Sequence, residues 1–357
     1  MRRATGLAAA VLTLAVASTS AGCSSGGIFS TGTSATGGNG AGGNGAGQVA
    51  THASGLTSAL DLIPDIHDGS VMYTDWSMRG HPAQNDPNTA SFATSLLTND
   101  LLLQQRALGF TVTDVRWELD VIWPSGAPLI VLGFPARTDL SGLAGSLTRH
   151  GFHADGSSLF TGSLATEARY GLSNVGVDTR RHLLAESGNV TRLRSVLTAP
   201  ASPLANASEL VPLLSLATTR LGRIATAAIA VGPAACVPLR VLVGIHATPA
   251  LLARMRQFFH GTFTPPQAEI TALAGPAGTT ALDALTFPDQ RTAEANRASR
   301  SAASKVATGM RFGGSSPVRV TGSAVTGRVL SFDMTATQAR DFTELVDYDD
   351  LGVDVCP

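Results

Sequence analysis

The chain has 357 residues, of which 26 are acidic and 25 basic, so the formal net charge is only −1. No stretch combines clustered basic residues with aromatic ones, which argues against nucleic acid as a partner. Hydrophobic residues make up 44% of the chain, enough to build a sizeable core. The match of Gly38, Gly40 and Gly43 to G-x-G-x-x-G has no strand before it and no helix after it, so we expect no cofactor.

The first 22 residues have the layout of a secretory signal peptide. Arg2 and Arg3 precede an uncharged apolar run over 6–17, and small residues fill 18–22. The apolar run is shorter than the roughly 20 residues that a transmembrane helix needs. We therefore expect residues 1–22 to be removed on export.

The residues Ser20-Ala21-Gly22-Cys23 resemble the lipobox of bacterial lipoproteins. The resemblance implies cleavage before Cys23 and acylation of Cys23, with palmitate among the expected acyl groups. The mature protein would then be lipid-anchored to the outer face of the cell membrane. The chain departs from the family pattern at Ser20, where the family usually has Leu. An ordinary secretory signal that happens to contain a cysteine is the alternative.

Residues 23–54 are expected to form a flexible linker. Gly, Ser, Thr, Ala and Asn dominate this stretch, and little in it is apolar enough to offset the entropy of ordering. A linker of this length has an r.m.s. reach of about 30 Å. It would hold a globular domain clear of the lipid headgroups.

Residues 55–188 are expected to form a first α+β module. The alternation of Val115, Trp117, Leu119, Val121 and Trp123 with polar residues predicts a half-buried strand. The predicted strands of this module are 71–76, 115–123, 129–134, 158–161 and 175–185, and the predicted helices are 89–108 and 140–150.

Residues 189–357 are expected to form a second module, with an insertion at 264–317. Thr264-Pro265-Pro266-Gln267 is interpreted as a capping box that opens a short helix, and the polar helix predicted over 289–308 as an exposed or loosely packed flank. The other predicted helices are 210–221, 249–260 and 337–346, with Asn189 and Ser208 as helix caps, and the predicted strands are 224–231, 239–245, 318–321 and 328–334.

Short matches between the two halves indicate an internal duplication. Pro128–Leu132 matches Pro238–Leu242, and His150-Gly151 matches His260-Gly261, in the same order along the chain. We therefore predict two tandem helix–strand–strand–helix–strand modules that form antiparallel sheets with helices on one face. This element order resembles a family of actinobacterial-type envelope lipoproteins of unknown function with tandem α+β repeats.

Cys236 and Cys356 are the two cysteines that remain after Cys23. In an exported protein, two such cysteines most simply form a disulfide bond. The alternative is two buried thiols.

No candidate catalytic or metal-binding site emerges from the motifs. Gly171-Leu172-Ser173-Asn174-Val175 lacks the last glycine of a nucleophile elbow, and the carboxylates of 347–354 fit a calcium loop only in part. Asp65, His67 and Asp68 lie at a turn, where Asp is common for structural reasons.

From the sequence we expect a lipid-anchored envelope lipoprotein that is not an enzyme and has a non-catalytic binding or scaffolding role. Its partners would be the membrane, through the anchor, and an envelope protein or a lipid. A carrier that holds an apolar ligand or lipid in an internal cavity is the alternative, and a secreted serine hydrolase is a less favoured one.

Overall fold

The computed structural model describes residues 55–79, 108–110, 112–239, 248–257, 260–274, 279–312, 318–337 and 354–356. The predicted signal peptide, Cys23 and almost all of the linker lie outside these ranges. So does nearly all of the helices predicted over 89–108 and 337–346 and of the strand predicted over 239–245. All described residues belong to one compact unit, Thr51–Pro357.

The described strands are β1 Gly69–Asp75, β2 Trp117–Ile122, β3 Leu129–Gly133, β4 Phe152–Asp155, β5 Leu159–Gly162, β6 Asn174–Asp178, β7 Leu183–Ser187, β8 Ile224–Val231, β9 Val237–Pro238, β10 Ala268–Ala274, β11 Thr280–Thr286, β12 Val318–Thr326, β13 Val329–Ala336 and β14 Val355–Cys356. The described α-helices are α1 Gly55–Leu60, α2 Trp76–Arg79, α5 Leu143–Arg149, α6 Leu164–Tyr170, α7 Val190–Thr198, α8 Val211–Leu221, α10 Pro249–Arg256 and α11 Gln290–Phe312. Short 3₁₀ helices are η1 Val112–Asp114, η2 Leu204–Asn206 and η3 Gly232–Ala235.

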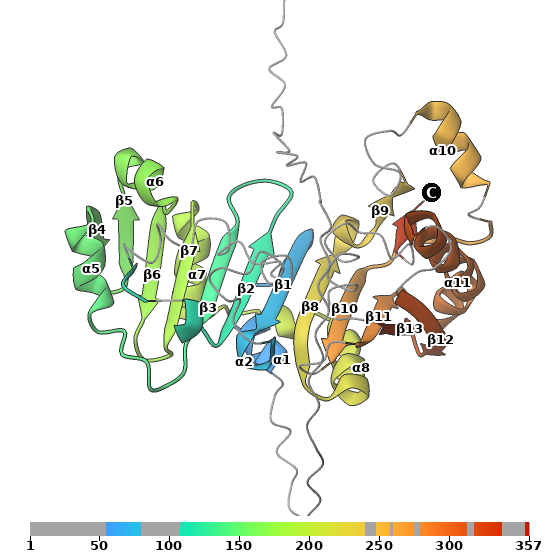
Figure 1. Ribbon diagram of the computed structural model, residues 1–357, viewed down its shortest axis with the longest axis horizontal. Coiled ribbons are helices and arrows are strands. Elements are labelled where there is room, and N and C mark those ends of the chain that lie inside the picture. Colours follow the sequence, from blue (N-terminus) through green and yellow to red (C-terminus); the bar gives the residue numbers. More distant parts are fainter. Residues whose placement is uncertain are drawn as a thin grey trace, which may run out of the picture. The chain divides into compact units, whose positions relative to one another are not determined.

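Twelve of these strands form a single antiparallel sheet in the order β12-β13-β11-β10-β8-β1-β2-β3-β7-β6-β5-β4 (Figure 1). The mixed α and β content that the sequence predicts is therefore confirmed. The sheet is continuous across the two halves of the chain, because β1 pairs with β8 in register from Gly69↔Val231 to Thr74↔Thr226. A separate two-stranded parallel pair joins β14 to β9.

The strand order is the same on both sides of the β1–β8 pair. Moving outward from β1, the sheet continues with β2, β3, β7 and β6, and moving outward from β8 it continues with β10, β11, β13 and β12. In the first series β3 is followed along the chain by helix α5, and in the second β11, at the same position, is followed by helix α11. The two halves therefore share one connectivity through these elements.

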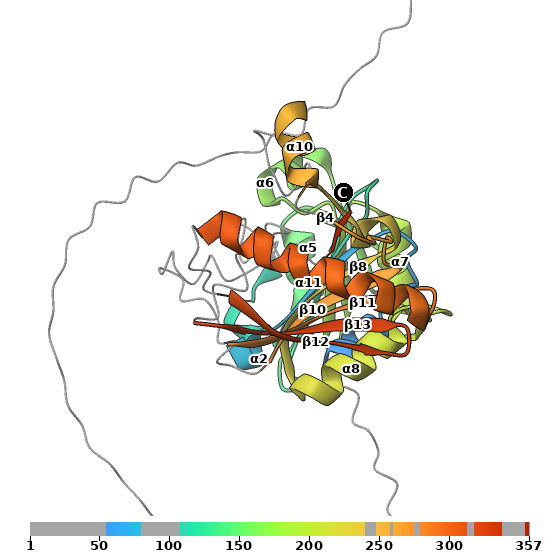
Figure 2. The ribbon, with the colours of Figure 1, turned by 90° about the vertical axis from the view of Figure 1, so that its right-hand side faces the viewer.

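Helices cover both faces of the sheet, so the prediction of helices on one face is wrong. In β11, Leu282 and Ala284 belong to the same core cluster as Leu213 of α8, whereas Leu285 belongs to a cluster with Ala293 of α11. Successive residues of a strand point to opposite faces, which places α8 and α11 on opposite sides (Figure 2). The sequence shows why, since strands such as β3 are apolar and buried along their whole length.

The core lies in three main apolar clusters. The largest packs α1, α7 and α8 against one face, and two smaller ones lie under α5 and under α11 on the other. Leu213 and Leu193 are fully buried in the first cluster. Burying one such side chain contributes about 1.5–3 kcal/mol to folding.

The strand predicted over 115–123 forms as β2, but it is not half-buried. Glu118 and Asp120, expected on a solvent-facing side, are only 1% and 2% exposed. The indole Nε1 of Trp76 donates a hydrogen bond to Oε2 of Glu118 at 3.1 Å. Burial of the polar face reflects tertiary packing that the local alternation pattern does not encode.

The described part of the predicted insertion at 264–317 supplies two strands of the sheet as well as helix α11. The predicted capping box leads into a strand, β10, and both β10 and β11 are interior strands of the sheet. Pro265 and Pro266 favour an extended conformation at the entry to β10 instead of starting a helix. From Ala268 the buried residues alternate between the two faces, as a strand buried on both sides requires.

Helix caps follow the sequence in part. The side chain of Asn189 accepts hydrogen bonds from the backbone N–H groups of Thr191 and Arg192, so the predicted cap of α7 is confirmed. Ser208 does not cap α8, which begins with Leu210 at the cap position, and its hydroxyl donates to Glu209 instead.

Candidate functional site

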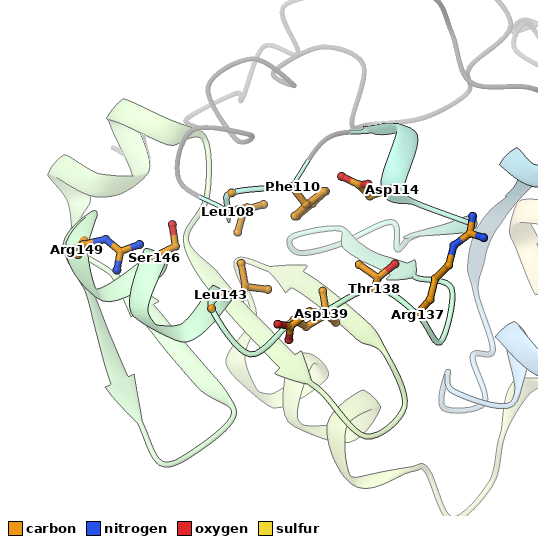
Figure 3. Close-up of a pocket in the computed structure, with 12 residues that line it drawn as sticks. Leu108, Phe110, Asp114, Arg137, Thr138, Asp139, Leu143, Ser146 and Arg149 are labelled. Carbon is orange, nitrogen blue, oxygen red and sulfur yellow. The ribbon is translucent and has the colours of Figure 1, made fainter.

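A pocket of about 570 Å³ lies between α5 and the segment that precedes β2 (Figure 3). Its size falls within the range of small-molecule sites. The lining comes from residues 108–114, from the loop between β3 and α5, and from α5 itself. The lining residues are Leu108, Gly109, Phe110, Asp114, Arg137, Thr138, Asp139, Leu140, Gly142, Leu143, Ser146 and Arg149.

The apolar part of the lining is a fixed surface of the core. Leu108, Leu140 and Leu143 are each at most 6% exposed and belong to the core cluster beneath α5. Phe110 packs edge-to-face on Phe134, with ring centroids 5.0 Å apart. An apolar ligand group would meet preformed, well-supported side chains here.

The loop between β3 and α5 is held by local hydrogen bonds. The backbone N–H of Ser141 donates to Oδ1 of Asp139 at 2.8 Å, and the hydrogen bonds from Ser141 lower the pKa of Asp139. The Nδ1 atom of His182 lies 3.2 Å from the carbonyl oxygen of Thr138. These contacts fix one wall of the pocket.

The charged side chains of the pocket differ in whether they have an interaction partner. Asp139 is engaged by Ser141, and Asp114 also has an interaction partner within the chain. Arg137 and Arg149 are exposed, and within the described ranges the structure records no ion pair or hydrogen bond of either guanidinium. In Figure 3 these two side chains lie at opposite ends of the pocket, with Leu108, Phe110 and Leu143 between them. The lining thus holds two carboxylates and two guanidiniums, and among the described residues only the guanidiniums have no recorded partner.

A second cluster of charged residues is buried between the sheet and α11. Arg300 is fully buried, and burial lowers its pKa to about 10 in spite of the charges of Asp354, Glu269 and Asp283. Burial, helped by the charge of Asp354, raises the pKa of Asp283 well above its ordinary value. The exposed polar flank predicted for 289–308 is therefore wrong, because this helix carries buried polar side chains.

This second cluster holds separate pieces of the chain together. The guanidinium of Arg300 donates to the carbonyl oxygens of Thr264 at 2.7 Å and of Val355 at 3.3 Å. The side chain of Asn296 accepts a hydrogen bond from the backbone N–H of Thr264 at 2.8 Å. Its chemistry is structural: it fixes the chain before β10 and the C-terminal strand β14 against α11.

The pocket and the buried cluster occupy corresponding places in the two halves. β3 runs Leu129-Ile130-Val131-Leu132-Gly133-Phe134-Pro135, and β11 runs Leu282-Asp283-Ala284-Leu285-Thr286-Phe287-Pro288, so both share Leu-x-x-Leu-x-Phe-Pro.

Two serine–glycine pairs extend this correspondence into the helices. Ser146 of α5 follows Phe134 at the same spacing as Ser299 of α11 follows Phe287. Each serine lies beside a glycine with positive φ, Gly109 in the first half and Gly261 in the second. The two halves differ in the side chains that lie between the helix and the glycine-containing segment.

The predicted disulfide is present. Cys236 and Cys356 are bonded, with their Cα atoms 5.6 Å apart, and they link the ends of β9 and β14. The lipidation site Cys23 lies outside the described residues. Sequence reasoning missed every pocket residue, since Leu, Thr and Arg at these positions carry no motif.

Residues 347–353, whose carboxylates fit a calcium loop in part, lie outside the described residues, whereas Asp65, His67 and Asp68 are described. Within the described ranges, no group of three or more His, Cys, Asp or Glu side chains is placed to hold a metal ion. The ring of His150 lies 2.8 Å from the carbonyl oxygen of Ser146 at the end of α5 and packs edge-to-face on Tyr170. Its role in the structure is therefore at the helix terminus.

Among the helices described, none has the length and hydropathy needed to span a membrane. Comparison with known proteins gives no match: no family model fits the chain, and no curated protein or solved structure is detectably similar to it.

Proposed function

We propose that this chain is a lipid-anchored binding protein of the cell envelope and that its ligand site is the pocket between α5 and residues 108–114. The observation that carries the proposal is the pocket itself: about 570 Å³, lined by apolar side chains of the core and by two guanidinium groups with no recorded partner among the described residues. Its size is that of small-molecule sites, and its lining combines apolar with polar side chains.

The proposed location rests on the N-terminal sequence. Ser20-Ala21-Gly22-Cys23 at the end of a signal-peptide-like leader supports acylation of Cys23, and the linker that follows supports a domain held at a distance from the membrane. The disulfide between Cys236 and Cys356 fits an oxidising compartment. The ligand would thus be met within a linker's reach of the outer face of the membrane.

A carrier of an apolar ligand is the second candidate. The contacts of Leu108, Leu140 and Leu143 with the pocket favour it. It differs from the first candidate in predicting that the ligand is neutral and fully apolar. The charged ends of the pocket favour the first candidate.

We also infer that the two halves arose by duplication, in a register different from the one that the short sequence matches suggest. Three features support it: the equal strand order about the β1–β8 pair, the shared Leu-x-x-Leu-x-Phe-Pro, and the matching serine–glycine pairs. In this register α5 corresponds to the first part of α11, and residues 268–302 correspond to 115–149.

Co-purification tests the binding proposal. The full chain is purified from a producing host, bound small molecules are extracted, and their identity and amount per chain are measured by mass spectrometry. Gly142 lines the pocket, and a Cβ added there has nothing within 4 Å, so Gly142→Phe is the substitution chosen to obstruct the pocket. Thr148→Phe adds the same side chain on the exposed side of α5, outside the lining, as the matched control.

We expect the wild-type chain and Thr148→Phe to carry the same molecule, and Gly142→Phe to carry at least about tenfold less, which corresponds to 1.4 kcal/mol of binding. Equal loading of Gly142→Phe would contradict the site. A robust hydrolytic turnover abolished by one point mutation would contradict the non-catalytic role. Membrane retention and acylation that survive Cys23→Ser would contradict the anchor.

A further inference from the structure

We infer that the ligand of this pocket is an anionic amphiphile: a molecule with an alkyl or similarly apolar body and a carboxylate or phosphate group. This inference rests on the proposed function and adds the chemical class of the ligand. It follows from the charges at the pocket's ends, from its apolar middle, and from the corresponding place in the second half.

The charge of the ligand follows from which groups already have partners. Of the two acidic residues of the lining, Asp139 accepts a hydrogen bond from the backbone N–H of Ser141, and Asp114 has an interaction within the chain. The guanidiniums of Arg137 and Arg149 have no recorded partner among the described residues. A guanidinium presents a planar fork of N–H donors that matches a carboxylate or phosphate group. An anionic group at either end of the pocket would therefore find a free donor set.

The body of the ligand follows from what lies between the arginines. Leu108, Phe110 and Leu143 separate the two guanidiniums in Figure 3. Leu108 and Leu143 are held in the core, and Phe110 is held by Phe134. A small hydrophilic anion such as phosphate or acetate would leave the exposed part of Phe110 in contact with water. An alkyl chain would cover it, at about 0.8 kcal/mol per buried methylene.

The second half shows what the same framework looks like when the chain fills it. There Arg300 and Asn296 of α11 stand where α5 has Leu147 and Leu143, and they bond the backbone at Thr264. The hydroxyl of Ser299 accepts from the backbone N–H of Thr262 at 2.9 Å. The open pocket of the first half is therefore not a necessary consequence of the fold. In the first half, leucines stand in place of Asn296 and Arg300, and the guanidiniums of Arg137 and Arg149 lie at the ends of the pocket.

Calorimetric titration with dodecyl compounds that differ in head group, and with acetate, tests the chemical class of the ligand. The full chain with Cys23→Ser, which removes the acyl group as a competitor, is titrated with dodecanoate, dodecanol, dodecyltrimethylammonium and acetate below their aggregation concentrations. We expect dodecanoate to bind one-to-one and at least about tenfold more tightly than the other three, a difference typical of one charge-assisted contact. Dodecyl phosphate separates the two anion types and should also bind.

Single substitutions locate the anion. Arg137→Ala and Arg149→Ala should each leave the affinity for dodecanol unchanged. At least one of them should weaken dodecanoate binding by about three- to tenfold, and this loss should be smaller at high salt concentration. Arg180→Ala removes an exposed arginine of the same half that lies outside the pocket, and should change neither. Gly142→Phe should abolish binding of every chain compound, while its circular dichroism and melting temperature report that it is folded.

The outcomes separate the two proposals. Equal affinity for dodecanoate and dodecanol, with no effect of either arginine substitution but loss in Gly142→Phe, overturns the anionic class and leaves the binding function intact. Binding that survives in Gly142→Phe, or no binding of any chain compound together with no co-purified molecule, overturns the proposed function as well.

Discussion

The guanidinium of Arg300 donates a hydrogen bond to the carbonyl oxygen of Thr264 at 2.7 Å, across the gap between α11 and the chain that leads into β10. The corresponding gap in the first half, between α5 and residues 108–114, is open and forms the pocket. One framework thus serves as a structural joint in one half and as a cavity in the other.

Replacing Arg300 by methionine should destabilise the fold by about 3–5 kcal/mol, because Asp283, Glu269 and Asp354 would lose the cation that faces them in a buried site. The free energy of unfolding from urea titration measures this. Arg297→Met is the matched control on the same helix, where an exposed arginine contacts Ser323. It should cost at most about 1 kcal/mol. Equal losses of stability in the two variants would show that the charge of Arg300 does not stabilise the buried cluster.

Asp283→Asn should flatten the dependence of stability on pH. Burial raises the pKa of Asp283, with Asp354 adding to the rise, so the folded state holds a proton that the unfolded state releases above pH about 4. The stability contributed by the protonated form is complete below that pH and is lost as pH rises through the folded pKa. Glu269, Thr271 and Arg300 also face this carboxyl group.

Within that window the wild-type chain should lose about 1.4 kcal/mol per pH unit relative to Asp283→Asn. Urea unfolding of both proteins at several pH values between 5 and 8 measures the difference. Parallel stability curves would mean that Asp283 is ionised in the folded state. The asparagine side chain is the closest neutral replacement for the protonated carboxyl, so the comparison isolates the proton.

Gly133→Ala should destabilise the sheet by about 1–3 kcal/mol through overpacking. Gly133 pairs with Trp117, and a Cβ at this position would lie 2.0 Å from Cε2 of the indole ring. Only the absence of a side chain lets the ring cover β3. Gly142→Ala, where nothing lies within 4 Å of the added Cβ, should leave the melting temperature almost unchanged. A neutral Gly133→Ala would mean that Trp117 can move aside.

Removing both cysteines of the disulfide, Cys236→Ser with Cys356→Ser, should lower the free energy of unfolding. The bond closes a loop of 120 residues, for which the chain-entropy relation gives about 4.7 kcal/mol as an upper value. Denaturant unfolding of the double variant and of the oxidised wild-type chain measures the loss. An unchanged midpoint would indicate that the contacts of Arg300 with Val355 hold β14 without the covalent link.

Much of the fold can be predicted from local patterns. The apolar run of β3 and the cap at Asn189 are short-range signals that the structure follows, and the alternation over 115–123 correctly predicts a strand although not its burial on both faces. The disulfide is predicted from the expected export of the chain and from the number of its cysteines.

Two errors come from contacts that lie far away in the sequence. Ala268–Ala274 is rich in alanine, which favours helices, yet it becomes a strand because β8 and β11 pair with it. Arg300 sits in a polar helix, and only the carboxylates of distant strands and β14 explain why it is buried.

The candidate site is harder to predict than the fold for the same reason. Its walls come from residues 108–114 and 137–149, and none of them has unusual chemistry. What makes the site is the absence of a bridging side chain at Leu143 and Leu147, which only the comparison with Asn296 and Arg300 reveals.

NMR of methyl-labelled leucines is the most direct test of the central claim that this pocket binds an anionic amphiphile. Dodecanoate should shift the methyl resonances of Leu108, Leu140 and Leu143, which line the pocket, and leave those of Leu213, in the core cluster on the opposite face, unchanged. Saturable shifts that dodecanol does not reproduce at the same concentration would agree with the account. Shifts centred on Leu213, or none at all in the pocket leucines, would contradict it.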